Sequence, residues 1–206
     1  MSEIRLLIAR HGETDFNKNG LMQGRGIDAP LNDRGIKQAK KLASYLKNYE
    51  TDLLVSSNLK RAIQTASYYS ESKGISLMKS SALDEMDFGD FEGRSYDDVI
   101  TELSYIDKAW RRGEIEKKIP GGESPLSVYE RASTAILTMI KEQEHGLITL
   151  VIHGRLMRIL FSEWLGFGIK NMHQIEHENG AVNQFVYKNG SFSVVYLNKT
   201  THLNGV

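Results

Sequence analysis

The sequence predicts an α/β fold of three layers, in which helices cover both faces of a mainly parallel central sheet and a β-hairpin closes the chain. Two observations support this prediction. Short apolar stretches typical of buried strands alternate with longer stretches whose apolar residues recur at helical spacing. The last stretch alternates apolar and polar residues on both sides of Asn189-Gly190, a pair that favours a tight hairpin turn.

The predicted elements follow one another along the whole chain. Strands are expected at residues 4–9, 52–57, the first part of 75–86, and 146–154. Helices are expected at residues 33–48, 59–72, 95–112, 124–143 and from 155 to Gly166. Ser95 is suited to cap the third of these helices and Pro125 to occupy the first turn of the fourth. Residues 181–198 form the expected hairpin, which would add antiparallel strands at the edge of the sheet.

Composition limits the classes of function. Hydrophobic residues make up 40% of the 206 residues and charged residues 25%, a balance that suits one globular domain with its own core. Lys and Arg together number 26, as do Asp and Glu, so no overall field favours nucleic acid or an anionic membrane. The absence of cysteine excludes disulfides, thiol catalysis and cysteine-ligated metals. Since the first apolar run is far shorter than a signal peptide or membrane span, a soluble cytoplasmic protein is expected.

Two predicted strands end in the same unusual way. Residues 10–12 read Arg-His-Gly and residues 152–154 read Ile-His-Gly, and the strand at 52–57 leads into a helix that carries Arg61. Because parallel strands end at one edge of a sheet, His11, His153, Arg10 and Arg61 are expected to converge there. Arginines and helix N-termini bind phosphate well, and glycine allows a ligand close to the backbone. A zinc site is the rival interpretation, but no carboxylates stand at ligand spacing and the basic neighbours would repel a cation.

With these residues at its strand ends, the chain resembles the histidine phosphatase superfamily, which comprises the phosphoglycerate mutase-like proteins. Its opening signature is matched by RHGETDFNKNGLMQGRGIDAPLNDRGIKQA, and SSNLKRAIQTA, LDEMDFGDFEG, PGGES and VIHG follow in order. The resemblance implies a single domain over residues 1–206 with a lid or specificity segment at about 86–122. Together the motifs span nearly the whole chain, which makes them far more specific than an isolated Arg-His-Gly.

The resemblance also implies roles for individual residues. His11 corresponds to the nucleophile that becomes phosphohistidine, and Glu85 to the general acid. Other matched positions contribute to the phosphate pocket or to the loop that closes over the substrate. These positions are Arg10, Arg61, His153, Asn17 and Gly154 for the phosphate pocket, and Gln23 and Gly24 for the loop. His177, in EHENGAVN, is a further candidate for the pocket border.

The chemistry of these residue types fits those roles. A nucleophilic imidazole must be neutral at one nitrogen, and cationic neighbours such as Arg10 and Arg61 favour its neutral form. The arginines stabilise the phosphoryl group in transit, so no metal is required. Glu85, as an acid beside a dianionic phosphate, would stay protonated and deliver its proton to the leaving alkoxide. No cofactor is expected.

Hydrolysis of a small phosphorylated metabolite is the first functional prediction. The short segment from Met86 to Gly121 and the FGDFEG motif resemble the phosphatase branch. The alternative is a phosphoglycerate mutase dependent on 2,3-bisphosphoglycerate, since Arg111-Arg112 resemble a pair that holds a substrate carboxylate in mutases. The interpretation of these two arginines as surface charges of the lid is preferred to that role. A catalytically silent binding protein is the third possibility. Partners are expected to be the metabolite alone, without nucleic acid or membrane, and a homodimer through the hairpin edge is possible.

Overall fold

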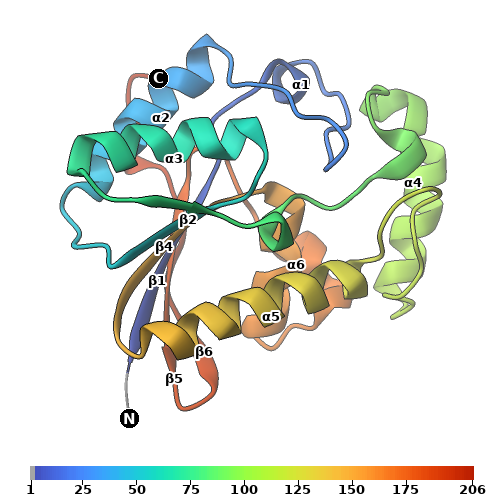
Figure 1. The fold of residues 1–206 in the computed structure, drawn as a ribbon. Coiled ribbons are helices and arrows are strands. Elements are labelled where there is room, and N and C mark those ends of the chain that lie inside the picture. Colours follow the sequence, from blue (N-terminus) through green and yellow to red (C-terminus); the bar gives the residue numbers. More distant parts are fainter. Residues whose placement is uncertain (1–2) are drawn as a thin grey trace.

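A six-stranded sheet forms the centre of the fold in the computed structural model, which describes residues 3–206 (Figure 1). The strand order is β3-β2-β4-β1-β5-β6. β1 to β4 run parallel, β5 is antiparallel to β1, and β6 is antiparallel to β5. The bounds are Ile4–Arg10 (β1), Leu53–Ser56 (β2), Leu77–Lys79 (β3), Gly146–Ile152 (β4), Val182–Lys188 (β5) and Ser191–Lys199 (β6). The predicted fold class, a mainly parallel sheet with a closing antiparallel hairpin, is confirmed.

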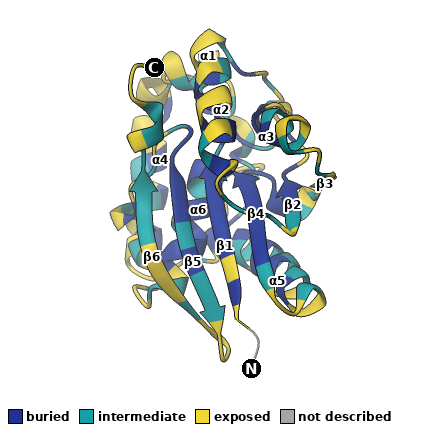
Figure 2. Cartoon of the chain, turned by 90° about the vertical axis from the view of Figure 1, so that its left-hand side faces the viewer, coloured by how far each residue is buried: buried dark blue, intermediate teal, exposed yellow. Residues whose placement is uncertain are grey.

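The pairing of β1 with β4 places the two histidines at one edge. Arg10 lies opposite Ile152 in this parallel pair, and the backbone amide of His11 donates to the Ile152 carbonyl over 3.0 Å. His11 and His153 are each the next residue after their strand. Because both strands are buried in the middle of the sheet, their common end is a rigid platform (Figure 2).

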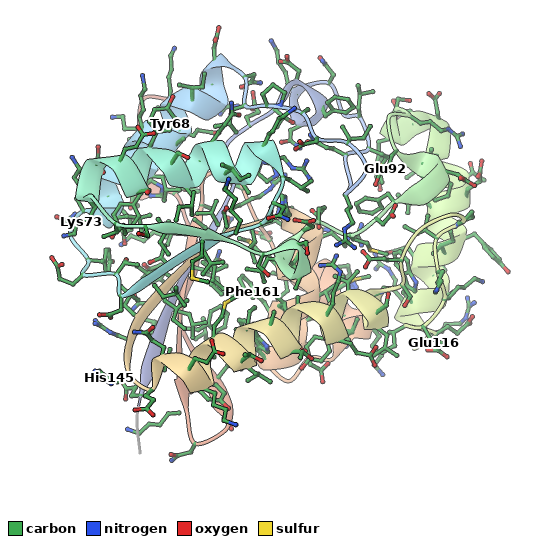
Figure 3. All side chains as sticks on the ribbon, in the orientation of Figure 1. Tyr68, Lys73, Glu92, Glu116, His145 and Phe161 are labelled. Atoms are coloured by element: carbon green, nitrogen blue, oxygen red, sulfur yellow. The ribbon has the colours of Figure 1, made fainter. Side chains whose placement is uncertain are left out.

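Helices cover the sheet on both faces, as Figure 1 shows. On one face α2 (Asp33–Leu46) and α3 (Lys60–Lys73) bury an apolar cluster with one set of strand residues. On the other face α5 (Pro125–Gln143) and α6 (Gly154–Trp164) bury a larger cluster, in which Phe161 is 1% exposed (Figure 3). The alternating strand residues thus supply both cores, and burial of this apolar surface is the main stabilising term.

The predicted lid segment carries α4 (Tyr96–Arg111), which stands to one side of the sheet in Figure 1. Ser95 caps it by accepting from the amide of Asp98 over 3.1 Å, as predicted. Val99 and Trp110 of this helix join the larger core cluster, and the Trp110 indole donates to the Lys117 carbonyl over 2.8 Å. The segment is therefore packed into the core and is not a detached flap.

The remaining elements are short. They are α1 (Asp15–Lys18), which the sequence pattern did not predict, and the 3-10 turns η1 (Ser81–Leu83), η2 (Gly89–Phe91), η3 (Ile169–Gln174) and η4 (Thr201–Leu203). Asn189 and Gly190 both have positive φ, 54° and 82°, as the predicted hairpin turn requires. Within residues 3–206, no helix is both long enough and apolar enough to cross a membrane.

Candidate active site

His11 is a buried, neutral imidazole with one nitrogen free for chemistry. Its Nδ1 lies 2.7 Å from the Gly12 carbonyl oxygen, and because that oxygen can only accept, Nδ1 carries the proton and Nε2 keeps its lone pair. Burial, followed by the charges of Arg61 and Arg10, holds the pKa of His11 well below its usual value. The arginines thus act in the expected direction, but removal of the ring from water is the larger cause.

His153 lies beside His11, with ring centroids 5.1 Å apart, and both of its nitrogens are engaged by protein groups. Arg61 Nε donates to Nδ1 over 3.3 Å, so the proton sits on Nε2, which lies 2.6 Å from the Ser57 hydroxyl oxygen. Burial and the charge of Arg61 lower the pKa of His153 well below its usual value. In this arrangement His153 orients Arg61, and its expected contact with phosphate remains a prediction.

Arg61 connects this pair to the loop that precedes α2. Besides His153 it donates to the Ile27 carbonyl over 2.8 Å and to the Gly24 carbonyl over 3.1 Å. A side chain at Gly24 would not fit, because a Cβ there would lie 2.6 Å from the Met86 carbonyl oxygen and 2.1 Å from a Glu92 carboxylate oxygen. Gly24 therefore allows the loop to lie close to the segment that follows Glu85, and Arg61 holds the loop beside His153.

A cavity of about 270 Å³ opens in front of His11. Its walls combine residues from the end of β1, from α1 and the loop after it, from the Glu85 segment, from the starts of α4 and α6, and from the loop that carries His177. The lining residues are Arg10, His11, Asn17, Leu21, Met22, Gln23, Glu85, Phe88, Tyr96, Gly154, Arg155, Arg158 and His177. The sequence-predicted residues His11, Arg10, Asn17, Gln23, Glu85 and Gly154 thus share one cavity, whereas Arg61, His153 and Gly24 are absent from its lining.

Several donors at this cavity have no partner. Arg10 Nε, Gln23 Nε2 and Arg158 Nε are buried side-chain atoms that make no hydrogen bond within the described residues. A buried donor without an acceptor costs free energy, so such donors mark a place where a ligand oxygen is expected. Burial lowers the pKa of Arg10 to about 10, which leaves it charged at neutral pH. The donor set suits an anion rich in oxygen, such as phosphate.

Glu85 reaches the cavity from the segment between η1 and η2. Its Oε1 accepts from the amides of Met86 and Leu156, each over 2.9 Å, and its Oε2 accepts from the amide of Arg155 over 3.0 Å. These amides belong to its own segment and to the start of α6. Since a carboxyl group has about four acceptor sites, one on Oε2 stays open for a proton shared with a substrate.

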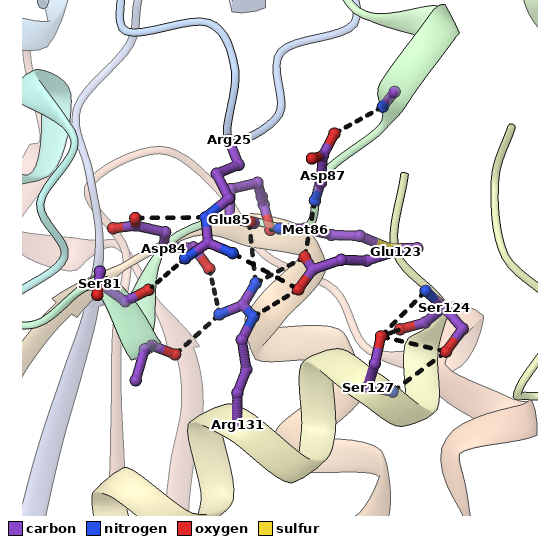
Figure 4. A network of polar contacts seen from close by, with 12 residues as sticks. Arg25, Ser81, Asp84, Glu85, Met86, Asp87, Glu123, Ser124, Ser127 and Arg131 are labelled. Carbon is purple, nitrogen blue, oxygen red and sulfur yellow. Dashed lines mark hydrogen bonds and ion pairs between the residues drawn. The ribbon is translucent and has the colours of Figure 1, made fainter. Parts of the chain in front are cut away.

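A network behind Glu85 fixes its backbone, as Figure 4 shows. Arg131 of α5 uses all five of its donors: two on the Glu123 carboxylate at 2.8 and 2.9 Å, and one each on the carbonyls of Ala82, Asp84 and Glu85. Glu123 in turn accepts from the amide of Asp87 over 2.9 Å. The segment that carries the general-acid candidate is thereby clamped from both sides.

With this geometry in place, comparison with known proteins identifies the family. The family model described as histidine phosphatase superfamily (branch 1) matches residues 6–200. The chain belongs to the histidine phosphatase superfamily. The resemblance of the sequence motifs is thus confirmed, and the chain is an enzyme of the histidine phosphatase and phosphoglycerate mutase-like type.

Relatives of this histidine phosphatase carry two kinds of name. Phosphoserine phosphatase 1 of Hydrogenobacter thermophilus is 28% identical over 200 residues, 97% of this chain and 94% of that protein. A probable phosphoglycerate mutase GpmB of Proteus mirabilis is 29% identical over 190 residues, 90% of this chain and 86% of that protein.

Solved structures in this superfamily superpose over nearly the whole chain. A phosphoserine phosphatase mutant of Entamoeba histolytica in complex with phosphoserine has a TM-score of 0.86 at 27% identity, covering 97% of this chain and 99% of its own. A mycobacterial glucosyl-3-phosphoglycerate phosphatase in complex with VO3 has a TM-score of 0.84 at 27% identity, covering 95% and 99%. The fold found here is therefore that of a phosphatase family.

The two arginines of the lid form separate ion pairs. Arg112 is 60% exposed in its side chain and pairs with Glu114 over 2.9 Å, outside the cavity in front of His11. Arg111 pairs with Asp107 and borders a neighbouring cavity of about 220 Å³. A joint grip on a substrate carboxylate by Arg111 and Arg112 remains a prediction that no contact in this structure supports.

Sequence reasoning missed two arginines of the histidine phosphatase site and left His177 open. Arg155 and Arg158 lie at the start of α6 and line the cavity. A signal was present, because residues three apart on a helix share a face and this helix begins at Gly154, directly after His153. His177 lines the cavity and its Nδ1 lies 3.0 Å from Arg10 Nη1; burial and then the charge of Arg10 lower its pKa.

Among the described residues, no group of three His, Cys, Asp or Glu side chains is placed to hold a metal ion.

Proposed function

We propose that this chain hydrolyses small phosphate monoesters through a phosphohistidine formed at Nε2 of His11. The observation that carries the proposal is the free Nε2 lone pair beside a cavity whose buried donors lack partners. The phosphatase names of its relatives support the same reaction class. The proposal includes a single domain in which residues 86–122 form one wall of the substrate site.

The reaction proceeds in two displacements. His11 Nε2 attacks the phosphorus, the N–P bond forms, and the P–O bond to the alcohol breaks. Glu85, protonated at the open site on Oε2, gives its proton to the departing alkoxide. Water then attacks the phosphorus while Glu85 takes a proton from it, and the N–P bond breaks to restore neutral His11 and release phosphate.

Charge on the transferred group is balanced by fixed donors. Arg10 and Gln23 offer unpartnered nitrogens at the cavity wall, and Arg61 stands behind His11. Such donors are already in place before the reaction, so they stabilise the transition state without reorganisation. Asn17 adds an amide group whose oxygen already accepts from Asn179 over 3.1 Å, so its nitrogen is the group available to phosphate.

Hydrolysis is preferred over phosphoryl return to a second hydroxyl because relatives named as phosphatases cover nearly the whole chain, and because Arg112, one of the two arginines that the mutase alternative requires, is exposed and pairs with Glu114. The test is an assay of purified protein with an aryl phosphate, and with 3-phosphoglycerate in the presence and absence of 2,3-bisphosphoglycerate. Phosphate release with little 2-phosphoglycerate is the expected result. Rapid isomerisation that requires the bisphosphate would instead identify a mutase.

His11→Ala is the variant that tests the intermediate. It should lower kcat for the aryl ester by roughly 10⁴-fold or more, since removal of a covalent nucleophile has effects of that order. Thermal unfolding followed by circular dichroism should show a folded protein. Retention of substantial turnover in the folded variant would rule out the phosphohistidine mechanism.

A further inference from the structure

Arg155 and Arg158 form a pair of cations at the boundary of two cavities. Both line the cavity in front of His11 and the neighbouring cavity of about 220 Å³. They are three residues apart at the start of α6, so they project from the same face of the helix. The main-chain amide of Arg155 donates a hydrogen bond to the Glu85 carboxylate, and the guanidinium of Arg155 takes no part in that contact.

Neither guanidinium has an acidic partner within the described residues. Arg155 contacts the sulfur of Met172 at 3.9 Å and lies over the rings of Phe88 and Trp110, each 5.8 Å away. Arg158 Nε is buried and makes no hydrogen bond. Burial lowers the pKa of both groups, yet an arginine in a protein stays protonated. Unpaired charges in such surroundings are costly, which indicates a partner supplied from outside the chain.

No acidic residue of the second cavity forms an ion pair with either arginine, although the charges of Asp107 and Glu85 favour the protonated form of both. The cavity's one acidic lining residue, Asp107, is engaged by Arg111 of the same helix turn. The other polar lining groups are Tyr96, Ser104 and His173, whose buried Nδ1 also lacks a partner. The space next to the two arginines is therefore polar, basic and suited to an anionic group.

We propose that Arg155 and Arg158 bind a carboxylate carried by the substrate itself, so that the substrates are phosphate monoesters of hydroxy acids rather than of uncharged alcohols. This inference rests on the proposed phosphatase function. The phosphate is held at the Arg10 end of the cavity, beside His11. The carboxylate accepts bidentate hydrogen bonds from the planar guanidinium groups of Arg155 and Arg158, and the second cavity receives the rest of the substrate.

A matched pair of substrates tests the proposal. 3-Phosphoglycerate and glycerol 3-phosphate differ by a carboxylate in place of a hydroxymethyl group, and each releases phosphate on hydrolysis. The wild type should have the higher kcat/KM for 3-phosphoglycerate. Arg155→Met and Arg158→Met should each lower that value about 10- to 100-fold, because hydrogen bonds to charged groups have that strength. For glycerol 3-phosphate the loss should be smaller, so that the ratio of the two kcat/KM values falls in both variants.

Controls separate this effect from loss of the fold. Arg5→Met changes an exposed arginine at the opposite end of β1 and should leave both substrates unchanged. Arg155→Lys keeps the charge and should restore part of the preference for the acid. Equal loss for both substrates in the folded arginine variants, or no preference in the wild type, would overturn the proposal.

Binding to His11→Ala, measured by calorimetry, gives a readout that does not need turnover. Tighter binding of 3-phosphoglycerate than of glycerol 3-phosphate, abolished by a second change at Arg155, supports the carboxylate site even if the wild type proves inactive. Absence of that difference overturns the carboxylate site even if the aryl ester is hydrolysed. The two proposals can therefore fail independently.

Discussion

The substitution Arg131→Met best tests how the fold positions Glu85, the general-acid candidate. Arg131 is 17% exposed and Glu123 18% exposed in their side chains, and all five donors of the arginine are used. Methionine keeps much of the packing volume but leaves the Glu123 carboxylate and three carbonyls without these donors. Because water can reach the partly exposed carboxylate, we expect a loss of about 3 kcal/mol in the free energy of unfolding. For a chain of this length that corresponds to a fall in Tm of about 6 to 12 °C.

The same variant should reveal whether Glu85 acts as the acid. An aryl ester has a good leaving group and needs little protonation, whereas glycerol 3-phosphate needs a proton on its alkoxide. If the clamp aligns Glu85, kcat for the alkyl ester should fall roughly 10-fold or more relative to the aryl ester. Lys141→Met, an exposed change on the same helix, is the matched control. A Tm change below about 2 °C together with an unchanged ratio of the two esters would refute the reasoning.

Three further predictions follow from the site. The folded pKa values of His11 and His153 lie well below the unfolded value of about 6.5, so the unfolded chain takes up protons first and stability falls as pH drops from about 7 to 5. Because the pKa values of His177 and His202 are lowered as well, the slope should be roughly 4 to 5 kcal/mol per pH unit at most in urea titrations, and His11→Gln should lower it by about a quarter to a third; a flat profile would show that the rings are not buried as neutral bases. Gly24→Ala should lower kcat/KM at least roughly 10-fold, since its Cβ would press on the Met86 carbonyl, and wild-type kinetics would contradict this close approach. Arg61→Lys should cost about 100-fold in kcat, because lysine cannot span His153 and the loop carbonyls; activity within threefold of wild type would count against that bridging role.

Local patterns predicted the elements well because burial and turn chemistry act within a few residues. The apolar runs at 4–9 and 146–154 became β1 and β4, and the helical spacing at 33–48 became α2, which ends at Leu46. Asn189-Gly190 formed the hairpin turn because both residues accept positive φ. The four-residue helix α1 escaped prediction, since so short an element has no period to detect.

Local sequence patterns did not predict which groups the side chains of the candidate site contact. Six of the predicted residues share the cavity, but the sequence could not tell that His153 turns both nitrogens to Ser57 and Arg61. Nor could it separate Arg112, which faces solvent, from Arg155 and Arg158, which face the cavity. A sequence does not distinguish these arginines, because the tertiary surroundings of each guanidinium decide whether it forms an ion pair.

By itself, the sequence determined the family, the fold class and the identity of the nucleophile and acid candidates. These depend on strand ends, glycine positions and the order of motifs, which are all visible in the order of residues along the chain. The tertiary structure decided the direction of each imidazole, the three amides that hold Glu85 and the unpaired cations at the start of α6. The physical reason is that hydrogen bonding and desolvation depend on groups brought together from distant parts of the chain. Residues 85, 131 and 155 meet only once the sheet has formed and the helices have packed on it.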